Sequence, residues 1–241
     1  MYPRHAARSG ARVMAALGFL LLLGSAGAGC ARAQPVAADS DLIPLPEIQR
    51  DGEVSVERAL ANRRSLRSYS QEGLSLEEIG QVLWSAQGAT DRGRTAPSAG
   101  ALYPIELYLV VGDVDELKPA VYRYHTAAHA VESVVAGDLR ARLREAAHGQ
   151  AWVGSPPAVL VVAGAVERTA AKYGSRAERY VLIEAGAVAE NVYLQCEALG
   201  LATVLVGAFT DEAVSGVLEL PQGEEAYVLM PLAHRRARDA R

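Results

Sequence analysis

Residues 179–199 form the longest helix expected in this 241-residue chain, and they limit most strongly how the chain can fold. Apolar residues occur around much of the circumference of this helix instead of along one stripe. A helix of this kind has to be covered on most sides, so we expect it at the centre of the domain. Gly200 is placed to end it, because glycine readily adopts the left-handed conformation that commonly follows a helix.

Shorter predicted elements lie on both sides of this helix in the sequence. Ser55 can cap a helix that runs to about Asn62, and Ser75 with Glu78 forms a capping box at the start of another. Strands are expected at residues 105–111, 120–124, 130–135, 158–164, 203–209 and 226–232, with short helices over 138–147 and after an Asp211 cap. Because hairpins alternate with helical crossovers, this order predicts an α+β fold around one sheet.

The composition is that of a globular protein. Half of the residues are hydrophobic (50%) and 22% are charged, which excludes collagen-like, disordered and disulfide-rich classes for the whole chain. The two cysteines, Cys30 and Cys196, cannot form a disulfide scaffold. We expect Cys196 to be a buried core residue.

The first 33 residues have the pattern of a signal peptide. Three arginines precede an apolar run of 11 residues at 13–23, and small residues follow up to Ala33. Cleavage after Ala33 is the favoured prediction, with lipidation of Cys30 as the alternative and an uncleaved anchor as a third reading. We therefore expect an exported protein, periplasmic or extracellular, with residues 34–54 as a tether and residues 55–241 as one domain.

The charge of the chain argues against some partners. The formal net charge is −4, and it becomes −8 when the four arginines of residues 1–33 are left out. So acidic a domain is a poor candidate for binding nucleic acid or an anionic membrane surface. No metal-binding pattern occurs either, since His125 and His129 flank a predicted turn and fit exposed turn residues better than ligands.

Four segments are candidates for a functional site, and each also has a purely structural reading. Arg63, Arg64, Ser65 and Arg67 suit a phosphate group, or they balance the dipole at a helix C-terminus. Pro97, Ser98, Ala99 and Gly100 lie in a long loop whose small residues would let a flat ligand approach the backbone, unless it is a plain surface loop. Lys172 and Tyr173 form a workable acid–base pair or are two surface residues, and residues 199–209 turn through Gly200 into a strand that ends at Gly207.

Taken in order, these segments resemble the nitroreductase superfamily, and most closely its SagB/ThcOx-like branch of FMN-dependent dehydrogenases. The matching motifs are R-R-S-x-R, S-A-G-x-L-Y-P, K-Y-G before R-Y, and G-L-x-x-x-x-V-G-x-F. The resemblance covers about residues 55–235 and leaves out the leader and the tether. It implies a mainly antiparallel sheet wrapped by helices, in a homodimer with two FMN molecules at its interface.

The resemblance also implies roles for individual residues. Arg63 and Ser65, with Arg64 beside them, would hold the FMN phosphate, and Arg67 would face the pyrimidine edge of the flavin. The remaining implied contacts are Pro97, Ser98, Ala99 and Gly100 from the other subunit, backbone of Gly207 and Ala208 near flavin N5, and a phosphate contact from Arg235 or Arg236. Ala233 departs from the family, which usually has glycine there, so the last contact stays open between these two arginines.

The same resemblance predicts the chemistry. In the branch that oxidises azoline rings of peptides, the Lys172–Tyr173 pair would be catalytic and remove a proton while hydride passes to N5. Nitro- and quinone reductases of the superfamily do not need the pair. We therefore expect an FMN-dependent oxidoreductase acting on a small-molecule or peptide substrate. The alternatives are an exported flavin carrier or scaffold without turnover, and a degenerate domain that binds no flavin.

Overall fold

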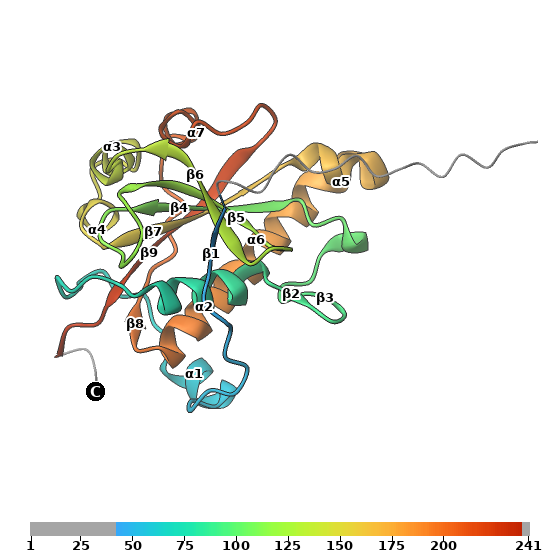
Figure 1. The fold of residues 1–241 in the computed structure, drawn as a ribbon. Coiled ribbons are helices and arrows are strands. Elements are labelled where there is room, and N and C mark those ends of the chain that lie inside the picture. Colours follow the sequence, from blue (N-terminus) through green and yellow to red (C-terminus); the bar gives the residue numbers. More distant parts are fainter. Residues whose placement is uncertain (1–41, 238–241) are drawn as a thin grey trace, which may run out of the picture. The chain divides into compact units, whose positions relative to one another are not determined.

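The computed structural model describes residues 42–237 (Figure 1). The predicted signal peptide, its cleavage after Ala33, the lipidation of Cys30 and the first part of the tether lie outside the described residues. None of the helices within residues 42–237 has both the length and the apolar character needed to cross a membrane.

A seven-stranded sheet forms the framework, and its strands have the order β1-β6-β5-β4-β7-β9-β8. The strands are β1 (Leu42–Pro44), β4 (Ile105–Val111), β5 (Ala120–His125), β6 (Ala130–Ala136), β7 (Ala158–Gly164), β8 (Leu201–Ala202) and β9 (Glu225–His234). All neighbouring pairs are antiparallel, including the central pairs β4–β7 and β7–β9. Together with the helices, this sheet confirms the predicted α+β class.

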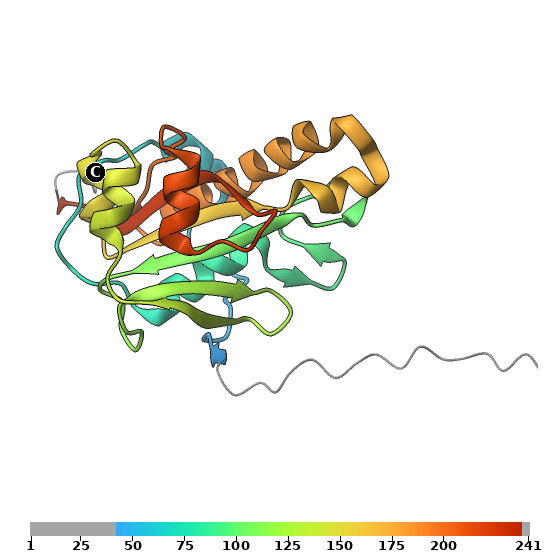
Figure 2. The ribbon, with the colours of Figure 1, turned by 90° about the horizontal axis from the view of Figure 1, so that it is seen from above.

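Helices connect and cover the strands. They are α1 (Val56–Asn62), α2 (Leu76–Gln87), α3 (Arg140–Ala146), α4 (Ala151–Gly154), α5 (Val166–Tyr173), α6 (Ala177–Ala198) and α7 (Asp211–Leu218). Short 3₁₀ helices span Ala99–Ala101 and Gly174–Arg176, and a separate hairpin pairs β2 (Ala89–Thr90) with β3 (Gly93–Arg94). Figures 1 and 2 show this hairpin and the α5–α6 corner at the same end of the sheet.

The sheet has one core on each face, and β4 shows how the sequence divides between them. Leu107 and Leu109 pack with residues of α2 and α6, whereas Tyr108 and Val110 pack with residues of α3 and α7. Successive strand side chains point to opposite faces, so a fully buried apolar strand such as β7 requires helices on both sides. Figure 1 accordingly shows α2 and α6 on one side of the sheet and α3 and α7 on the other.

Helix α6 is the longest helix of the described residues and extends over 22 residues, or roughly 33 Å at 1.5 Å per residue. It packs mainly against α2, α5 and α1 and reaches the sheet through β9 and β7. Gly200 follows its end with a φ of 71°, as predicted. Its inner face includes the fully buried Val181, Val188 and Val192, whereas Leu182 and Ile183 are exposed. The predicted long helix is confirmed, but within residues 42–237 it is covered on one face only and not on most sides.

Two other details differ from the sequence-based expectations. Residues 203–209 were expected to form a strand, but only Leu201–Ala202 pair with β9, and beyond them Val206 makes a single bridge to Leu229. The strand prediction for residues 203–209 is wrong. Val204 and Val206 are buried and alternate with exposed residues, which is the pattern of a strand, but the segment forms no continuous ladder of hydrogen bonds. In addition, Thr210, not Asp211, is the residue that precedes α7.

Within the expected tether, Leu42–Pro44 pair with β6 and form the edge strand β1. His129 fixes the chain that follows β1 through both ring nitrogens, which lie 3.0 Å from the Tyr124 hydroxyl and 3.1 Å from the Pro46 carbonyl oxygen. His129 therefore connects the N-terminal segment to the β5–β6 hairpin.

Cys196 is buried in the core, as predicted, and burial raises the pKa of its thiol to about 12.

Burial lowers the pKa of His129, against a smaller opposing effect of its hydrogen bond to Pro46. Because this pKa is lower in the folded than in the unfolded state, the free energy of unfolding should decrease as pH falls below about 6.5. We expect His129→Asn to remove this part of the pH dependence, since asparagine tolerates the local φ of 45°. Urea denaturation at pH 7.5 and 5.5 measures the difference.

The matched control is His148→Asn, because His148 is exposed and also has a positive φ, 55°. This control should keep the wild-type pH dependence. Equal pH dependence in wild type and His129→Asn would contradict the assignment.

Candidate functional site

The segment that follows α1 brings Arg63 and Ser65 to the side of Tyr193 on α6. The Arg63 guanidinium lies 5.1 Å from the centroid of the Tyr193 ring. The Ser65 Oγ shares a 2.8 Å hydrogen bond with the Tyr193 hydroxyl, which also accepts the backbone N–H of Leu205 at 2.7 Å. One phenol of α6 therefore fixes Ser65 relative to the chain that leads to Gly207.

Arg67 and Tyr69 continue this segment along β8 and β9. The Arg67 guanidinium lies 5.5 Å from the centroid of the Trp152 ring on α4. Tyr69 is buried in a small cluster with Ala202, and burial raises its pKa against the opposing effect of Arg67. The buried polar atoms with no hydrogen-bond partner among the described residues include Tyr69 Oη, Trp152 Nε1 and Thr203 Oγ1. Such atoms are rare in folded proteins, and three of them lie around this one segment.

The C-terminal arginines have different environments. Arg235 forms an ion pair with Glu197 and donates from Nε to the Leu201 carbonyl oxygen at 2.9 Å. Arg236 is exposed and donates from Nε to the Tyr69 carbonyl oxygen at 2.8 Å. Arg235 is thus engaged inside the chain, and Arg236 lies next to the segment that carries Arg67.

Gly207 and Ala208 lie exposed in the connection between Val206 and α7. The Ala208 carbonyl oxygen accepts a hydrogen bond of 2.7 Å from the Gln150 side chain. A Cβ on Gly207 would meet no atom within 4 Å inside this chain. The backbone here is therefore accessible to a ligand.

A second group of predicted residues lies at the other end of α6. Gly100 has a φ of 64°, and a Cβ there would lie 2.7 Å from Lys172 Nζ and 2.8 Å from the Tyr173 hydroxyl. Tyr173 in turn packs edge-on against Tyr180 with ring centroids 4.9 Å apart. The loop with Pro97, Ser98, Ala99 and Gly100 and the Lys172–Tyr173 pair thus form one group within a single chain.

The predicted residues therefore fall into two groups. The first contains Arg63, Ser65 and Arg67 and contacts Tyr193 near the C-terminal end of α6; the second contains Gly100 and Lys172 near its N-terminal end. Tyr180 and Tyr193 are about 20 Å apart along the helix axis, at 1.5 Å per residue. A single chain consequently holds the two groups apart.

A buried carboxylate lies between these groups. Glu184 on α6 is 3% exposed and accepts a hydrogen bond of 3.0 Å from the Gln87 side chain. Burial raises its pKa, and hydrogen bonds from Ser98 and Gln87 and the charges of Arg94 and Arg168 act in the opposite direction. No group of three or more His, Cys, Asp or Glu within the described part of the chain could hold a metal ion.

Comparison with known proteins shows the family to which the chain belongs. The family model described as the nitroreductase family matches residues 60–234. The chain belongs to the nitroreductase family. The family prediction is confirmed, and the protein is an oxidoreductase of this family.

Three known proteins are similar to this chain over more than half of its length. MJ1384 of Methanocaldococcus jannaschii, a protein named as a nitroreductase, is 40% identical over 199 residues, which cover 82% of this chain and 98% of MJ1384. The microcin B17-processing protein McbC of Escherichia coli is 31% identical over 157 residues, covering 62% of this chain and 58% of McbC. A crystal structure described as a nitroreductase from Ralstonia eutropha is 29% identical with a TM-score of 0.72, covering 84% of this chain and 93% of that one.

Sequence reasoning missed several residues around the nitroreductase-family motifs. Tyr193 and Trp152 give no signal of their own, because aromatic residues at helical spacing are ordinary core residues. Glu184 could have been noticed, since it is the one charged residue in the apolar stretch 181–189. A carboxylate on the inner face of a central helix has to find partners, and Gln87 and Ser98 are among them.

Proposed function

We propose that this nitroreductase-family oxidoreductase uses FMN, held between two copies of the chain, to exchange hydride with a small-molecule or peptide substrate. The observation that carries the proposal is the division of the motif residues between the two ends of α6. Each group is assembled within the chain, and each has features that suit a different part of the same cofactor.

The residues near Tyr193 fit the phosphate and the polar edge of FMN. A phosphate monoester carries close to two negative charges, which suits Arg63 and Arg64 with Ser65 as an additional donor. The Arg67 guanidinium lies over the Trp152 ring and beside the buried Tyr69, which together fix its position. Arg67 would place a fixed cation at the pyrimidine edge, where positive charge stabilises the reduced flavin.

Further contacts would come from two backbone segments and the C-terminus. Gly207 and Ala208 present accessible backbone in the turn before α7. Arg236 is the better C-terminal candidate for the phosphate, because Arg235 is paired with Glu197. When bound, FMN would supply an atom that accepts and donates hydride.

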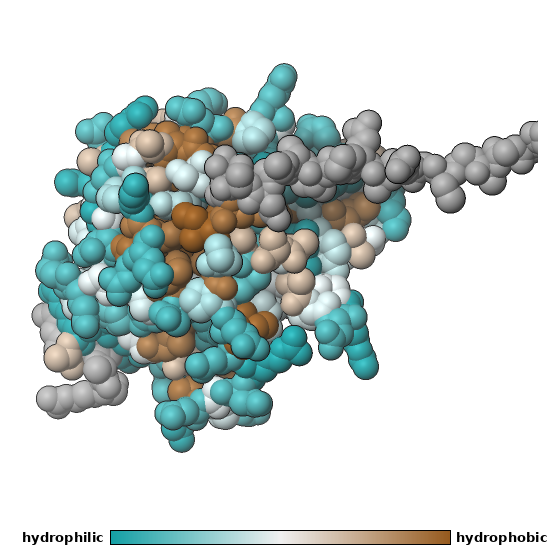
Figure 3. Space-filling view, viewed as in Figure 1, coloured by the Kyte–Doolittle hydropathy of each residue, from teal (hydrophilic) through white to brown (hydrophobic). Residues whose placement is uncertain are grey.

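The exposed face of α6 supports a homodimer. Leu182 and Ile183 are 49% and 63% exposed, and Gly186, near the middle of α6, has open space where a side chain would be. On α1, Val56 and Leu60 are also exposed. The face drawn in Figure 3 carries hydrophobic residues, in brown, in several places among the hydrophilic ones. Exposed apolar residues beside a small residue suit the close approach of a second helix.

A two-fold axis through the middle of α6 would complete the site. Symmetric dimers place the same patch of both copies in contact, and with this axis perpendicular to the helix the two α6 helices would run antiparallel. The N-terminal end of α6 in one copy would then lie beside the C-terminal end of α6 in the other. Residues Pro97 to Gly100 and Lys172 of one chain would thereby join Arg63 and Arg67 of its partner.

Lys172 and Tyr173 would move the proton that accompanies hydride transfer. The Lys172 amine and the Tyr173 hydroxyl both pack against Gly100, where a side chain would collide with them, so the two proton-transfer groups lie close together. Oxidation of a C–H substrate removes one hydrogen as hydride and another as a proton, and the pair would take the proton. The similarity to McbC favours a heterocyclic ring of a processed peptide as the substrate.

The leader supports the further proposal that the protein is exported. Residues 1–33 carry the signal-peptide pattern, with cleavage after Ala33 or lipidation of Cys30 as the two routes.

Lys172→Ala tests the proton-transfer role. It should leave FMN and dimer intact and slow the oxidation of a C–H substrate such as a peptide thiazoline by about 10²–10⁴-fold, the usual contribution of positioned proton transfer. Reduction of an artificial quinone by the reduced enzyme needs no such base and should change little. Both rates are measured on one preparation.

The matched control is Lys118→Ala, which removes the other lysine of the chain, also exposed. Loss of flavin in Lys172→Ala would make the residue structural, and unchanged rates would remove it from the mechanism. Bound flavin that neither substrate nor reductant can cycle would favour the carrier over the enzyme.

Arg63→Ala and Arg67→Leu should have different effects. Loss of Arg63 removes a charged hydrogen bond worth about 1.5–3 kcal/mol, so FMN affinity should fall by roughly ten- to a hundredfold. Loss of Arg67 should lower the flavin reduction potential while leaving more of the cofactor bound. Ultrafiltration and spectroelectrochemistry measure the two quantities, and equal effects of both variants would contradict separate roles.

A further inference from the structure

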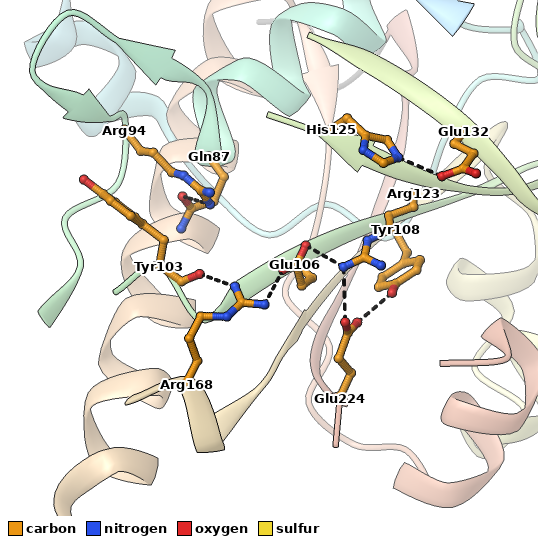
Figure 4. A network of polar contacts seen from close by, with 10 residues as sticks. All are labelled: Gln87, Arg94, Tyr103, Glu106, Tyr108, Arg123, His125, Glu132, Arg168 and Glu224. Carbon is orange, nitrogen blue, oxygen red and sulfur yellow. Dashed lines mark hydrogen bonds and ion pairs between the residues drawn. The ribbon is translucent and has the colours of Figure 1, made fainter. Parts of the chain in front are cut away.

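Arg168 connects the loop of residues 96–104 to α5, the helix that carries Lys172. Its guanidinium donates from one nitrogen to the Tyr103 carbonyl oxygen at 2.6 Å and from another to a Glu106 carboxylate oxygen at 2.8 Å. Figure 4 shows Arg168 with both of these hydrogen bonds. Because hydrogen bonds from a charged donor are stronger than those between neutral groups, this side chain joins the end of the loop firmly to the helix.

The loop follows one face of α5 through three contacts. These contacts join Pro104 to Ala165, Tyr103 to Arg168, and Gly100 to Lys172. The three partners on the helix side are three and four positions apart in the sequence, which is the spacing of neighbours on one helix face. Arg168 makes the middle contact and lies one helical turn before Lys172.

The backbone of the loop needs support at this point. Gly100, Ala101 and Tyr103 have φ values of 64°, 55° and 47°. Left-handed conformations are unfavourable for residues with a Cβ, so they persist only where the surroundings hold them. Arg94 on β3 lies 4.5 Å from the centroid of the Tyr103 ring, and Arg168 holds the carbonyl oxygen of the same residue.

The position of the Lys172 amine depends on this loop. Lys172 is exposed, and a lysine side chain gives up much rotamer freedom when its amine is fixed. A Cβ on Gly100 would lie only 2.7 Å from Lys172 Nζ, so the loop backbone and the amine are in close contact. Movement of the loop away from α5 would release the amine.

Arg168 is itself held by the sheet. The Glu106 side chain is 17% exposed and also pairs with Arg123 at 3.1 Å. Arg123 pairs in turn with Glu224 at 3.2 Å, and Glu224 accepts the Tyr108 hydroxyl at 2.6 Å. Figure 4 shows this network, which joins β4, β5 and the chain before β9. The guanidinium therefore has a fixed anchor on one side and the loop on the other.

We infer that Arg168 is a positioning residue, which fastens the loop to α5 and thereby holds the Lys172 amine against Gly100. The effect on catalysis rests on the proposed function, in which Lys172 takes a proton from the substrate. The fastening of the loop does not rest on it and can be measured without substrate.

Hydrogen–deuterium exchange of the purified protein tests the fastening. Arg168→Gln should accelerate exchange in peptides covering residues 99–103 by about three- to tenfold, because a charged hydrogen bond that is partly open to solvent is lost. Arg168→Lys should have a smaller effect, since it keeps the charge but not the forked donor. Arg142→Gln is the control, because Arg142 lies exposed on α3 at the other face of the sheet.

Kinetics test whether Arg168 acts through Lys172. With a C–H substrate, Arg168→Gln should lower kcat by about tenfold with little change in KM, and Arg168→Lys should recover part of the rate. Reduction of an artificial quinone should not change. The double variant Arg168→Gln with Lys172→Ala should be no slower than Lys172→Ala alone, because a residue that acts only by placing the amine has no effect once the amine is gone.

Several results would overturn the inference. Unchanged exchange in residues 99–103 would show that Arg168 does not hold the loop, and a rate loss that adds to that of Lys172→Ala would show that it acts independently. Equal loss of quinone reduction, or loss of flavin, would make it a general structural residue. If Arg168→Gln does not fold, Arg168→Lys supports the same comparisons.

The two proposals fail in different ways. If Lys172→Ala leaves the C–H rate unchanged while Arg168→Gln accelerates exchange in the loop, the proposed proton transfer is refuted and the fastening of the loop stands. If Lys172→Ala slows the C–H substrate while Arg168→Gln alters neither exchange nor kcat, the positioning role is refuted and the proposed function stands.

Discussion

Helix α6 packs against the sheet through its buried inner face, and its two ends contact different segments of the chain. Because the helix is about 33 Å long, whatever packs at one end is separated from what packs at the other. Tyr193 near the C-terminal end holds Arg63 and Ser65, and Tyr180 near the N-terminal end packs on Tyr173. The length and burial of this one helix thus determine that the motif residues form two groups instead of one.

Burial of α6 also explains where a second copy would bind. Its inner face is occupied by the sheet and α2, and nothing within residues 42–237 covers the apolar Leu182 and Ile183. Gly186 lies close to the midpoint of the helix, where two antiparallel copies would cross. A dimer of this kind would cover the exposed apolar residues and combine the two groups in the same step.

The elements that are best predicted from the sequence are those whose local residue pattern fits only one kind of secondary structure. Strand β7 has the predicted bounds because seven consecutive apolar residues buried on both faces fit a central strand, and α2 begins at its capping box. Residues 203–209 show the limit, since Val204 and Val206 are buried alternately as in a strand, but the segment keeps only a single bridge to β9, between Val206 and Leu229. The short edge strand β1 has three residues, too few for a periodic pattern.

Motif residues could be identified in the same way, but their grouping could not. Nothing in the sequence places Gly100 beside Lys172 or Ser98 beside Glu184, because these contacts depend on how the loop packs on α5 and α6. The sequence likewise left Arg235 and Arg236 equivalent, whereas the ion pair with Glu197 distinguishes them. Contacts between distant segments decide the site, and they follow from the fold.

Mixed dimers test the shared FMN site most directly. One copy would carry Arg63→Ala with Arg67→Leu, and the other would carry Gly100→Leu, which clashes with Lys172 and Tyr173. Each homodimer should retain little FMN, and heterodimers isolated with two affinity tags should bind one FMN per dimer with wild-type affinity. Heterodimers that bind no FMN, or a wild-type monomer that binds one FMN per chain, would contradict a site shared between two copies.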